Sequence, residues 1–419
     1  MPELRAPIGT RDVVAPESAR WARLVARFAV TAEAAGYGLV LTPLFEDLAV
    51  FQRVGEATDI VRKEMYDFED KGGRHLALRP EVTASVVRSY IQLRPTLPWK
   101  SWYVGPNFRY ESPQAGRYRQ FYQLGLEAIG SADADLDVEV IGLAWSLYDA
   151  MGLRQVGLSI NSLGDDVCRP GYRELLLRFL EARRAELCDE HRIRLEDNPL
   201  RALDCKKPEC MAATVDAPRQ LDHLCEPCGA HFARVREGLM ALGVPHTVDT
   251  RLVRGLDYYT RTTFEFPSGA LDSAQNALGG GGRYDGLVEA MGGPPTPGIG
   301  FALGIERILL ACDAEGVAEA GGGGVDVFVV DLTGGGAARD VTFELRAAGW
   351  RADRAFDARS AKAQFKAADR SGARLAVVIG PDEAAAGTVS VKDLRGGAPG
   401  GQVTVARAHL GDEVRRRLG

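Results

Sequence analysis

The chain has 419 residues, of which 46% are hydrophobic and 26% are charged, and its formal net charge is −6. A chain of this length exceeds what one core usually serves, so we expect two or three domains. No apolar run reaches the length of about 18 residues that a membrane helix needs, and the N-terminus lacks the apolar stretch of a signal peptide. These features argue against a membrane or secreted protein and predict a cytoplasmic one without a membrane partner.

The charge is unevenly distributed along the chain. Residues 325–419 contain 15 Lys and Arg against 12 Asp and Glu, whereas residues 1–324 contain 36 against 45. Phosphate neutralisation normally needs a basic surface, so the net negative charge of the whole chain argues against nucleic acid binding. The basic C-terminal part permits an RNA contact without requiring one.

The first elements are predicted from periodicity and composition. Apolar residues at helical spacing predict a helix over 17–35 with Gly36 as its C-terminal cap, and a strand over 39–41 follows. Aromatic and aliphatic residues predict strands over 102–110 and 121–129, separated by a long polar loop.

The middle of the chain differs from its flanks. Residues 163–244 are predicted to form a separate, mostly helical insertion, and residues 1–162 and 245–315 together form the domain that it interrupts. The stretch 316–324 is rich in glycine, which is typical of a flexible linker.

A further domain is predicted over 325–419. Strands alternate with helices there, which indicates a small α/β domain. The strands are expected at 325–332, 375–379 and 389–392, and the helices at 337–348 and 360–371.

Three separated clusters each join an arginine to a carboxylate: Phe108–Glu111, Arg254–Tyr259 and Gly298–Arg307. A guanidinium group stays charged and binds phosphate bidentately, so three such clusters brought together by folding would make a nucleotide polyphosphate site. One cluster alone would indicate only a solvated face. The set as a whole favours ATP chemistry.

Glycines also cluster in this part of the chain. The run Gly279–Gly282 is not followed by Gly-Lys-Ser/Thr, and Gly298 and Gly300 lack the spacing of a dinucleotide-binding loop. We interpret the glycines as positions of close backbone approach to a substrate, and a plain flexible loop is the alternative.

Four cysteines of the insertion have a spacing near that of a zinc ribbon: Cys205, Cys210, Cys225 and Cys228. Two interpretations stay open, a four-cysteine structural zinc site and four reduced thiols, since cytoplasmic thiols are seldom in disulfides. In the second interpretation His223 and His231 are surface residues. The cysteines without partner spacing are Cys168, Cys188 and Cys312.

Together, the arginine clusters resemble the three signature motifs of class II aminoacyl-tRNA synthetases, and the segment Arg254–Tyr259 narrows the resemblance to the histidyl-tRNA synthetase family. Further matches are Gly9–Asp12, Leu78–Glu81, Gly280–Gly286, Gln364–Lys366 and Val391–Asp393. The resemblance implies an α+β catalytic domain built on an antiparallel sheet, a helical insertion and a C-terminal α/β anticodon-binding domain. It also implies a homodimer, because the helix over 17–35 and the strand that runs into Pro43 resemble the first class II motif, which forms the dimer interface in that family.

The resemblance implies ATP-dependent ligation of L-histidine to tRNA(His) through a histidyl-adenylate, with Mg²⁺ as the counterion of ATP. Arg109 and Arg254 would meet the α-phosphate as catalytic residues, and Glu306 is the candidate carboxylate for the metal. The adenine would lie between Phe121 and Arg307. The other ATP-binding residues would be Glu111 and Arg117.

Histidine selection needs partners for the ammonium group and for both imidazole nitrogens. The resemblance implies that Glu81 binds the ammonium group, with Thr83 beside it. An apolar amino acid would leave the polar groups of such a site unpaired and would therefore be rejected. The other implied histidine-binding residues are Gln123, Glu127, Arg254, Tyr258, Tyr259 and Tyr284. Gln114 is the implied contact to the acceptor end of the tRNA.

A rival interpretation is a synthetase-like regulatory subunit that binds histidine as a signal for a biosynthetic enzyme. Such proteins commonly lack the catalytic arginine segment and the anticodon-binding domain. Because this chain has Arg254 and a whole domain over 325–419, we expect a class II histidine–tRNA ligase.

Overall fold

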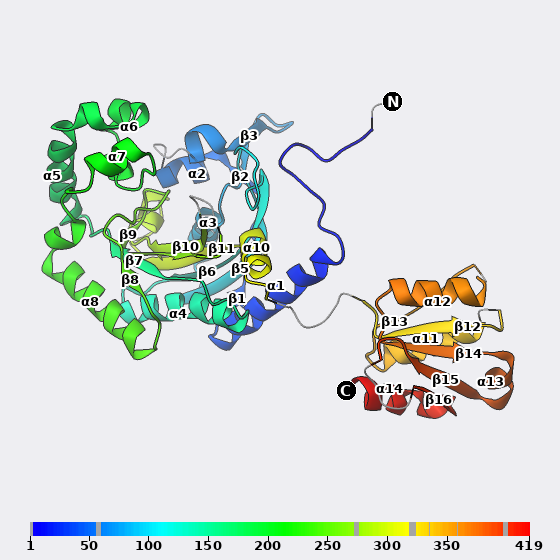
Figure 1. Ribbon diagram of the computed structural model, residues 1–419. Helices are drawn as coiled ribbons and strands as arrows, with labels where there is room; N and C mark the ends of the chain where they lie inside the picture. Colours follow the sequence, from blue (N-terminus) through cyan, green and yellow to red (C-terminus); the bar gives the residue numbers. More distant parts are fainter. Residues whose placement is uncertain are drawn as a thin grey trace. The chain divides into compact units, whose positions relative to one another are not determined.

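The chain forms two compact units in the computed structural model, which describes residues 3–55, 60–271, 276–317, 324–334, 336–357, 359–396 and 401–419 (Figure 1). One unit comprises Met1–Val13 and Arg20–Ala318, and the other comprises Val14–Ala19 and Glu319–Gly419. Of the predicted linker, residues 318–323 lie outside the described part. A search of the described helices finds none that is long and apolar enough to cross a membrane.

Eight strands form the central sheet of the first unit, in the order β1-β5-β6-β11-β10-β9-β7-β8. The strands from β5 to β7 in this order run antiparallel, and only β1 and β8 pair in parallel with their neighbours. The antiparallel sheet predicted for this unit is therefore confirmed. The strand bounds are β1 Gly38–Leu39, β5 Trp99–Phe108, β6 Gln120–Ile129, β7 Ser159–Ser162, β8 Thr247–Val248, β9 Thr260–Pro267, β10 Ala277–Arg283 and β11 Gly298–Gly304.

The hairpin of β5 and β6 confirms the two predicted strands and fixes the loop that carries charged residues. Phe108 pairs with Gln120 at the loop end and Trp99 with Ile129 at the other end. Because the hydrogen-bonded ladder stops at Phe108, the loop that follows is free to turn its side chains over the sheet.

Helices α1, α4 and α10 cover one side of this sheet, and Figure 1 shows α1 and α4 beneath it. On α1, Leu24, Phe28 and Ala32 are buried, and the Phe28 ring meets Trp102 edge to face at 5.9 Å. Gly36 follows α1 with a positive φ of 82°, which confirms the predicted helix and its cap. The helix bounds are α1 Glu17–Ala34, α4 Ala134–Ala150 and α10 Ile305–Ala314.

A second hydrophobic cluster joins the tyrosines of the 254–259 segment to helices α2, α3 and α9. A three-stranded sheet of order β2-β4-β3 adjoins these helices. The bounds are β2 Phe45–Asp47, α2 Leu48–Gly55, a π-helix Ile60–Glu64, β3 Tyr66–Glu69, β4 His75–Leu78, α3 Thr83–Leu93 and α9 Leu287–Ala290.

The segment from 163 to 244 is mostly helical and belongs to the first unit. Its own apolar cluster includes Tyr172, Leu176 and Leu180 of α5. The bounds are α5 Arg169–Glu181, η2 Arg184–Glu186, α6 Asp189–Arg194, η3 Pro199–Ala202, α7 Pro208–Ala213, η4 Gln220–His223 and α8 Glu226–Ala241.

A buried ion network ties this segment to the sheet. Arg283 of β10 is fully buried and donates through Nε to Asp137 of α4 at 3.0 Å. His231 of α8 contacts the same carboxylate, with 2.7 Å between Nε2 and Oδ2. The expectation that His231 is a surface residue is therefore wrong. Its side chain is a further partner of the buried Asp137 carboxylate, and a buried charge needs such partners. His223 is exposed, as expected.

The second unit contains a five-stranded sheet of order β13-β12-β14-β15-β16. Strands β13, β12 and β14 are parallel, whereas β15 and β16 run antiparallel to their neighbours. The predicted strands and helices of the α/β domain are confirmed, and β13, β16, α13 and α14 are additional. The bounds are β12 Val327–Asp331, α11 Gly336–Ala347, β13 Ala352–Arg354, α12 Ala361–Arg370, β14 Leu375–Ile379, α13 Pro381–Ala386, β15 Thr388–Asp393, β16 Gln402–Ala406, η5 Arg407–His409 and α14 Leu410–Leu418.

Candidate active site

A cavity of about 940 Å³ lies within the first unit, lined by residues of the central sheet, of the start of α3, of the loop between β5 and β6 and of the helical segment around α6 and α7. Its walls bring together residues from all three arginine clusters, although these clusters lie far apart in the sequence. The predicted site residues that line it are Glu81, Thr83, Arg109, Glu111, Arg117, Phe121, Gln123, Arg254, Tyr258, Tyr259, Glu306 and Arg307.

Three predicted residues lie away from the cavity wall. Glu127 and Tyr284 are buried behind it. Gln114 is exposed in the loop between β5 and β6, where its backbone forms a two-way bridge with Arg117 at 2.9 and 3.0 Å. The loop therefore holds Gln114 at the surface and Arg117 at the cavity.

Glu127 is the centre of a buried hydrogen-bond network. Its Oε1 accepts from the Thr83 hydroxyl at 2.6 Å, and its Oε2 accepts from the Tyr284 hydroxyl at 2.6 Å. Burial raises the pKa of Glu127 to about 8, despite the two hydroxyl donors that favour the charged form. The site thus contains a carboxyl group that can change its charge when a ligand enters.

The glycines explain how Glu127 fits into the sheet. A Cβ atom at Gly300 of β11 would lie 1.8 Å from Glu127 Oε2, so any side chain there would displace the carboxylate. Gly280 of β10 likewise leaves space for Arg254, whose Nη1 would lie 2.8 Å from an added Cβ. The run Gly279–Gly282 lies in strand β10, so the alternative of a plain flexible loop is wrong.

Glu81 lies just before α3 and turns back onto the start of the helix. Its Oε2 accepts from the Thr83 backbone N–H at 2.6 Å, and its Oε1 accepts from Ala84 N–H at 2.8 Å. Burial raises the pKa of Glu81 even though both N–H donors favour its charged form. The helix start therefore fixes this carboxylate in place at the cavity wall.

Tyr258 and Tyr259 form an aromatic wall beside these carboxylates. Their ring centroids lie 4.7 Å apart, and the Tyr258 ring meets Tyr284 edge to face at 6.0 Å. Burial raises the pKa of all three phenols, so their hydroxyl groups stay protonated and act as hydrogen-bond donors.

Arg109 is oriented by backbone and aromatic contacts. Its Nε donates to the carbonyl of Pro80 at 2.9 Å, and its guanidinium carbon lies 5.2 Å from the centroid of the Phe121 ring. Arg117 pairs with Glu111 at 2.5 Å between Nε and Oε2. The loop cluster thus presents a fixed cation above an aromatic face, with a neighbouring ion pair.

Arg254 is held by a residue that sequence reasoning missed. Glu265 of β9 accepts from its Nη1 at 2.6 Å. Arg254 Nε is also buried and has no hydrogen-bond partner among the described residues, which leaves one donor of the guanidinium unsatisfied. The pattern of strand β9 could have indicated Glu265, since Thr263 and Glu265 alternate with buried Phe264 and Phe266.

Glu306 and Arg307 begin α10 at the far end of the cavity. Both oxygens of Glu306 accept from the backbone N–H of Tyr122, at 3.0 and 3.2 Å. Burial and the nearby Arg117 charge lower the pKa of the Arg307 guanidinium. Glu306 therefore anchors the start of α10 to β6, and Arg307 joins the Arg117–Glu111 pair in the cavity wall.

Gln123 has a hydrogen-bond partner that the sequence did not reveal. Its Oε1 accepts from Asn107 Nδ2 at 2.7 Å, and Asn107 is fully buried on the paired strand β5. The contact fixes the orientation of the Gln123 amide toward the cavity.

The cysteines do not form the predicted four-cysteine site. Cys205 and Cys210 lie with Cys188 and His191, whereas Cys225 and Cys228 lie with Asp165 and Cys168. In each group the ligand atoms are within 4.8 Å of one another. The two pairs do not meet, because each lies with a different third thiol, Cys188 for the first pair and Cys168 for the second. Cys168 and Cys188, which have no partner by sequence spacing, therefore have partners in space.

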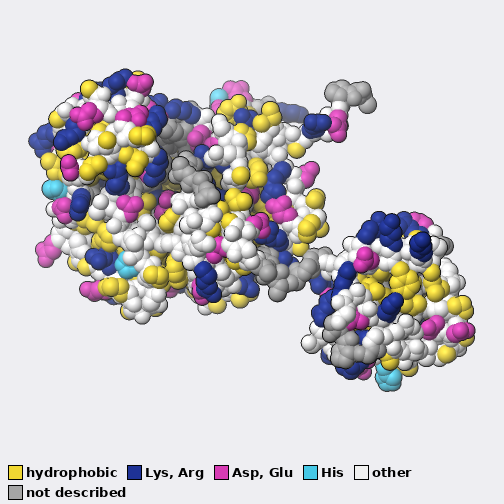
Figure 2. All heavy atoms as spheres, in the orientation of Figure 1, with side chains coloured by type: hydrophobic (Ala, Val, Ile, Leu, Met, Phe, Trp, Pro, Cys, Tyr) yellow, Lys and Arg dark blue, Asp and Glu magenta, His cyan; other side chains and the backbone are white. Residues whose placement is uncertain are grey.

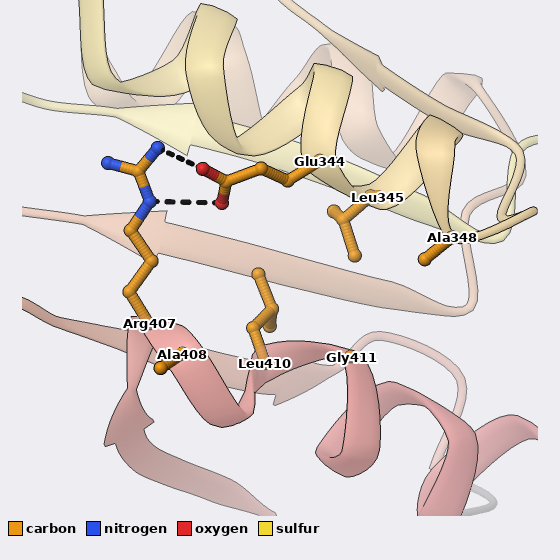
Figure 3. Close-up of a pocket in the computed structure, with 7 residues that line it drawn as sticks. All are labelled: Glu344, Leu345, Ala348, Arg407, Ala408, Leu410 and Gly411. Carbon is orange, nitrogen blue, oxygen red and sulfur yellow. Dashed lines mark hydrogen bonds and ion pairs between the residues drawn. The ribbon is translucent and has the colours of Figure 1, made fainter.

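The second unit has a smaller pocket, lined by Glu344, Leu345, Ala348, Arg407, Ala408, Leu410 and Gly411 (Figure 3). Arg407 and Glu344 pair in its wall, with 2.6 Å between Nη2 and Oε1. These charges satisfy each other, and no predicted site residue lies there. The cavity of the first unit is therefore the candidate active site.

An antiparallel sheet with arginines and carboxylates in a cavity over its strands is the architecture of the class II aminoacyl-tRNA synthetases. A family model described as histidyl-tRNA synthetase matches residues 9–308, and an anticodon binding domain model matches residues 326–417. The chain is 50% identical to the histidine–tRNA ligase of Rhodococcus erythropolis, over 98% of this chain and 97% of that protein. The chain therefore belongs to the histidyl-tRNA synthetase family, class II enzymes that ligate histidine to tRNA.

Solved structures agree with this assignment. The crystal structure of apo S. aureus histidyl-tRNA synthetase is 37% identical, with a TM-score of 0.82, over 99% of this chain and 100% of that chain. A structure described as an ATP phosphoribosyltransferase regulatory subunit/histidyl-tRNA synthetase from Bacillus halodurans is 22% identical, with a TM-score of 0.62. It covers 84% of this chain and 93% of that chain, and this likeness shows the fold alone.

Proposed function

We propose that the cavity of the first unit binds ATP and L-histidine together and joins them as histidyl-adenylate, from which histidine passes to tRNA(His). The observation that carries this assignment is the meeting of Arg109 and Arg254 with Glu81 in one cavity. Two cations and a carboxylate suit a ligand pair in which one member is a polyphosphate and the other carries an ammonium group.

Arg109 and Arg254 are the proposed catalytic residues. During activation, the carboxylate of histidine attacks the α-phosphorus of ATP, and negative charge increases on the phosphate oxygens while pyrophosphate leaves. Fixed guanidinium groups stabilise that charge without transferring a proton. The unsatisfied buried Nε of Arg254 is a donor for such an oxygen, and the pair with Glu265 keeps the side chain in position.

Glu81 and Glu127 are the proposed partners of the amino acid. Glu81 faces the ammonium group, with Thr83 beside it, while Glu127 faces the imidazole ring. The Glu127 carboxyl can be charged or protonated near neutral pH. An imidazole N–H that donates to it favours the charged form. Four further residues complete this part of the site, namely Gln123, Tyr258, Tyr259 and Tyr284.

The adenine is proposed to lie over Phe121, near Arg307, with Glu111 at its edge and Arg117 at the phosphates. Class II synthetases require Mg²⁺ with ATP. Carboxylate oxygens are the ligand type that this ion prefers, and Glu306 supplies one at the cavity wall. Gln114, exposed in the loop beside the cavity, is the proposed contact to the tRNA acceptor end.

The second unit is proposed to read the tRNA. Helix α12 carries Lys362, Lys366 and Arg370 at a spacing of four residues, and all three are exposed. Figure 2 shows Lys and Arg side chains gathered over this helix. Four-residue spacing places the three cations on one helix face, which suits contact with a phosphate backbone.

We also propose a homodimer that works in the cytoplasm, where its tRNA substrate is charged. The first motif contributes exposed apolar residues, Val30, Leu39 and Leu41, which a second copy would cover. The boundaries 1–162 with 245–315, 163–244, 316–324 and 325–419 remain our proposal for the domains. Sedimentation of the purified chain tests the dimer, and a monomer at all concentrations would contradict it.

The proposed role of Arg254 is tested by histidine-dependent pyrophosphate exchange. Removing one preorganised cation from a phosphoryl-transfer site costs about 10² to 10³ in rate. We expect R254A to lower the exchange rate by that amount, with its circular dichroism spectrum unchanged. R236A, on the exposed side of α8, is the matched control and should exchange at the rate of the unsubstituted enzyme. Unchanged exchange in R254A would remove the assigned role.

A further inference from the structure

We propose that the helical segment of this chain binds two zinc ions at separate sites. The first site consists of Cys188, His191, Cys205 and Cys210, and the second consists of Asp165, Cys168, Cys225 and Cys228. Neither site depends on the proposed catalytic function, because each is defined by its own ligand atoms.

The first site has the donor set and the spacing of a structural zinc centre. His191 Nδ1 lies 3.1 Å from Cys188 Sγ and 3.7 Å from Cys210 Sγ. In a zinc tetrahedron, with bonds of about 2.3 Å to sulfur and 2.0 Å to nitrogen, a sulfur and a nitrogen ligand lie about 3.6 Å apart. The side chains are therefore already arranged around a point that a metal ion would occupy.

Two short-spaced ligand pairs supply this site. Cys188 and His191 bracket the start of α6 with two residues between them, and Cys205 and Cys210 lead into α7 with four between them. Both spacings fall in the range of two to four that zinc-binding pairs typically show. The backbone N–H of Cys188 donates to Cys210 Sγ at 3.2 Å, a contact that stabilises a thiolate ligand.

The second site repeats this arrangement at the starts of two longer helices. Cys168 precedes α5, and Cys225 and Cys228 lie at the start of α8. Asp165 Oδ1 lies 3.5 Å from Cys168 Sγ and 3.6 Å from Cys225 Sγ, close to the separation of about 3.5 Å expected between oxygen and sulfur ligands of one zinc ion.

Charge favours a cation at the second site. Asp165 adds a carboxylate to the three sulfur ligands, and Cys168 and Cys225 stand at the N-caps of α5 and α8, where the helix dipoles lie. Arg261 contacts Asp165 from outside the cluster, with 3.4 Å between Nη2 and Oδ2, and so orients the carboxylate as outer partners of metal ligands do.

Six of the seven cysteines take part in these two groups, and all seven are free of disulfides. Three sulfurs with one imidazole or carboxylate are a donor set that suits zinc, whereas the hard ions Mg²⁺ and Ca²⁺ require oxygen ligands. Cys312 is buried in the main core, away from both groups, which makes it the natural control.

Elemental analysis of the full chain tests the proposal directly. The protein would be produced without a histidine tag in zinc-supplemented medium, and zinc per chain would be measured by plasma mass spectrometry. We expect about two zinc ions in the unsubstituted chain and in C312A, and about one in each of C205S/C210S and C225S/C228S. Zinc near zero would overturn both sites. A single ion lost in both double variants would overturn the two-site arrangement in favour of one shared site.

Thiol reactivity of the unsubstituted chain provides a second readout that does not depend on the variants folding. Cys168, Cys205 and Cys225 are half-buried, so they should react with an alkylating reagent after a chelator removes the metal. Re-adding zinc should slow alkylation at these three positions by at least about tenfold, because metal-bound thiolates are poor nucleophiles. Equal reactivity with and without zinc at Cys205 would overturn the first site, and equal reactivity at Cys168 and Cys225 would overturn the second.

Discussion

Glu127 is a carboxyl group that the fold keeps away from water while surrounding it with hydroxyl donors. Thr83 and Tyr284 each donate to one of its oxygens, and the glycine at position 300 leaves just enough space for it. The result is a raised pKa of about 8 rather than a permanently charged group. In a site that must distinguish an imidazole from an apolar side chain, such a group can respond to the ligand by losing its proton.

This raised pKa makes stability depend on pH. Because the native pKa is about 8 and the ordinary value is 4.5, the folded state binds a proton that the unfolded state has released between these values. The stabilisation from this group is complete below pH 4.5 and is lost as pH rises through about 8. The nearby Glu81, whose pKa burial also raises, acts in the same direction.

We expect E127Q to remove this dependence without changing the shape of the side chain. The melting temperature of E127Q, relative to that of the unsubstituted chain, should increase by several degrees as pH rises from 5 to 9. E46Q, at a buried carboxylate that pairs with Arg88 instead, is the control. A difference that stays constant over this pH range would contradict the raised pKa.

Arg109 and Arg254 illustrate what residue patterns could and could not predict. The cluster motifs placed Arg109 and Arg254 correctly in one cavity, because charged residues within apolar segments are informative. The alternation of β9 could have indicated Glu265, but its contact with Arg254 depends on the fold, and Asn107 meets Gln123 only through the pairing of β5 with β6. The zinc-ribbon prediction was wrong for a similar reason: the spacing from Cys188 to His191 is visible in the sequence, but only folding brings Cys205 and Cys210 to these residues.

At the scale of elements, periodic helices and strands were predicted closely and short ones were not. Helix α1 and strand β14 match their expected ranges to within one residue. Strand β13 has three residues and depends on its parallel pairing with β12, so no local pattern marks it. Helices and strands with a regular amphipathic pattern can be predicted from the local sequence, whereas short edge strands form through tertiary contacts.

Helix α12 is the element on which the tRNA contact is expected to depend. No ion pair joins Lys362, Lys366 or Arg370 to a carboxylate within the part of the chain that the structure describes. By contrast, Arg415 and Arg416 of α14 pair with Asp412 and Glu413 of the same helix. Unpaired cations on one face are available to phosphates, and paired ones are not.

We expect K362E/K366E/R370E to raise the KM for tRNA by at least about tenfold, because three phosphate contacts would become repulsive. Histidine-dependent pyrophosphate exchange, which needs no tRNA, should stay within about twofold of the unsubstituted rate. R415E/R416E changes charge on the same unit and should leave both rates unchanged. Equal losses in charging and exchange for the α12 variant would argue against a separate RNA-reading unit.

At the scale of the whole molecule, the chain has two units, and we expect the first to activate histidine and the second to read the tRNA. The first unit has a sheet whose glycines let buried side chains lie close to the strands, and its cavity collects residues separated by about 200 positions. The second unit has the basic balance and a separate core. Composition and linker signals predicted this division, since each unit buries its own apolar residues.

Histidine-dependent activation is the central claim, and pyrophosphate exchange with each of the twenty amino acids tests it most directly. With ATP and Mg²⁺ but no tRNA, we expect rapid exchange with histidine and, for every other amino acid, a rate lower by at least about 10³-fold, because their side chains leave the polar groups around Glu127 unpaired. Comparable exchange with a second amino acid, or none with histidine, would contradict the account.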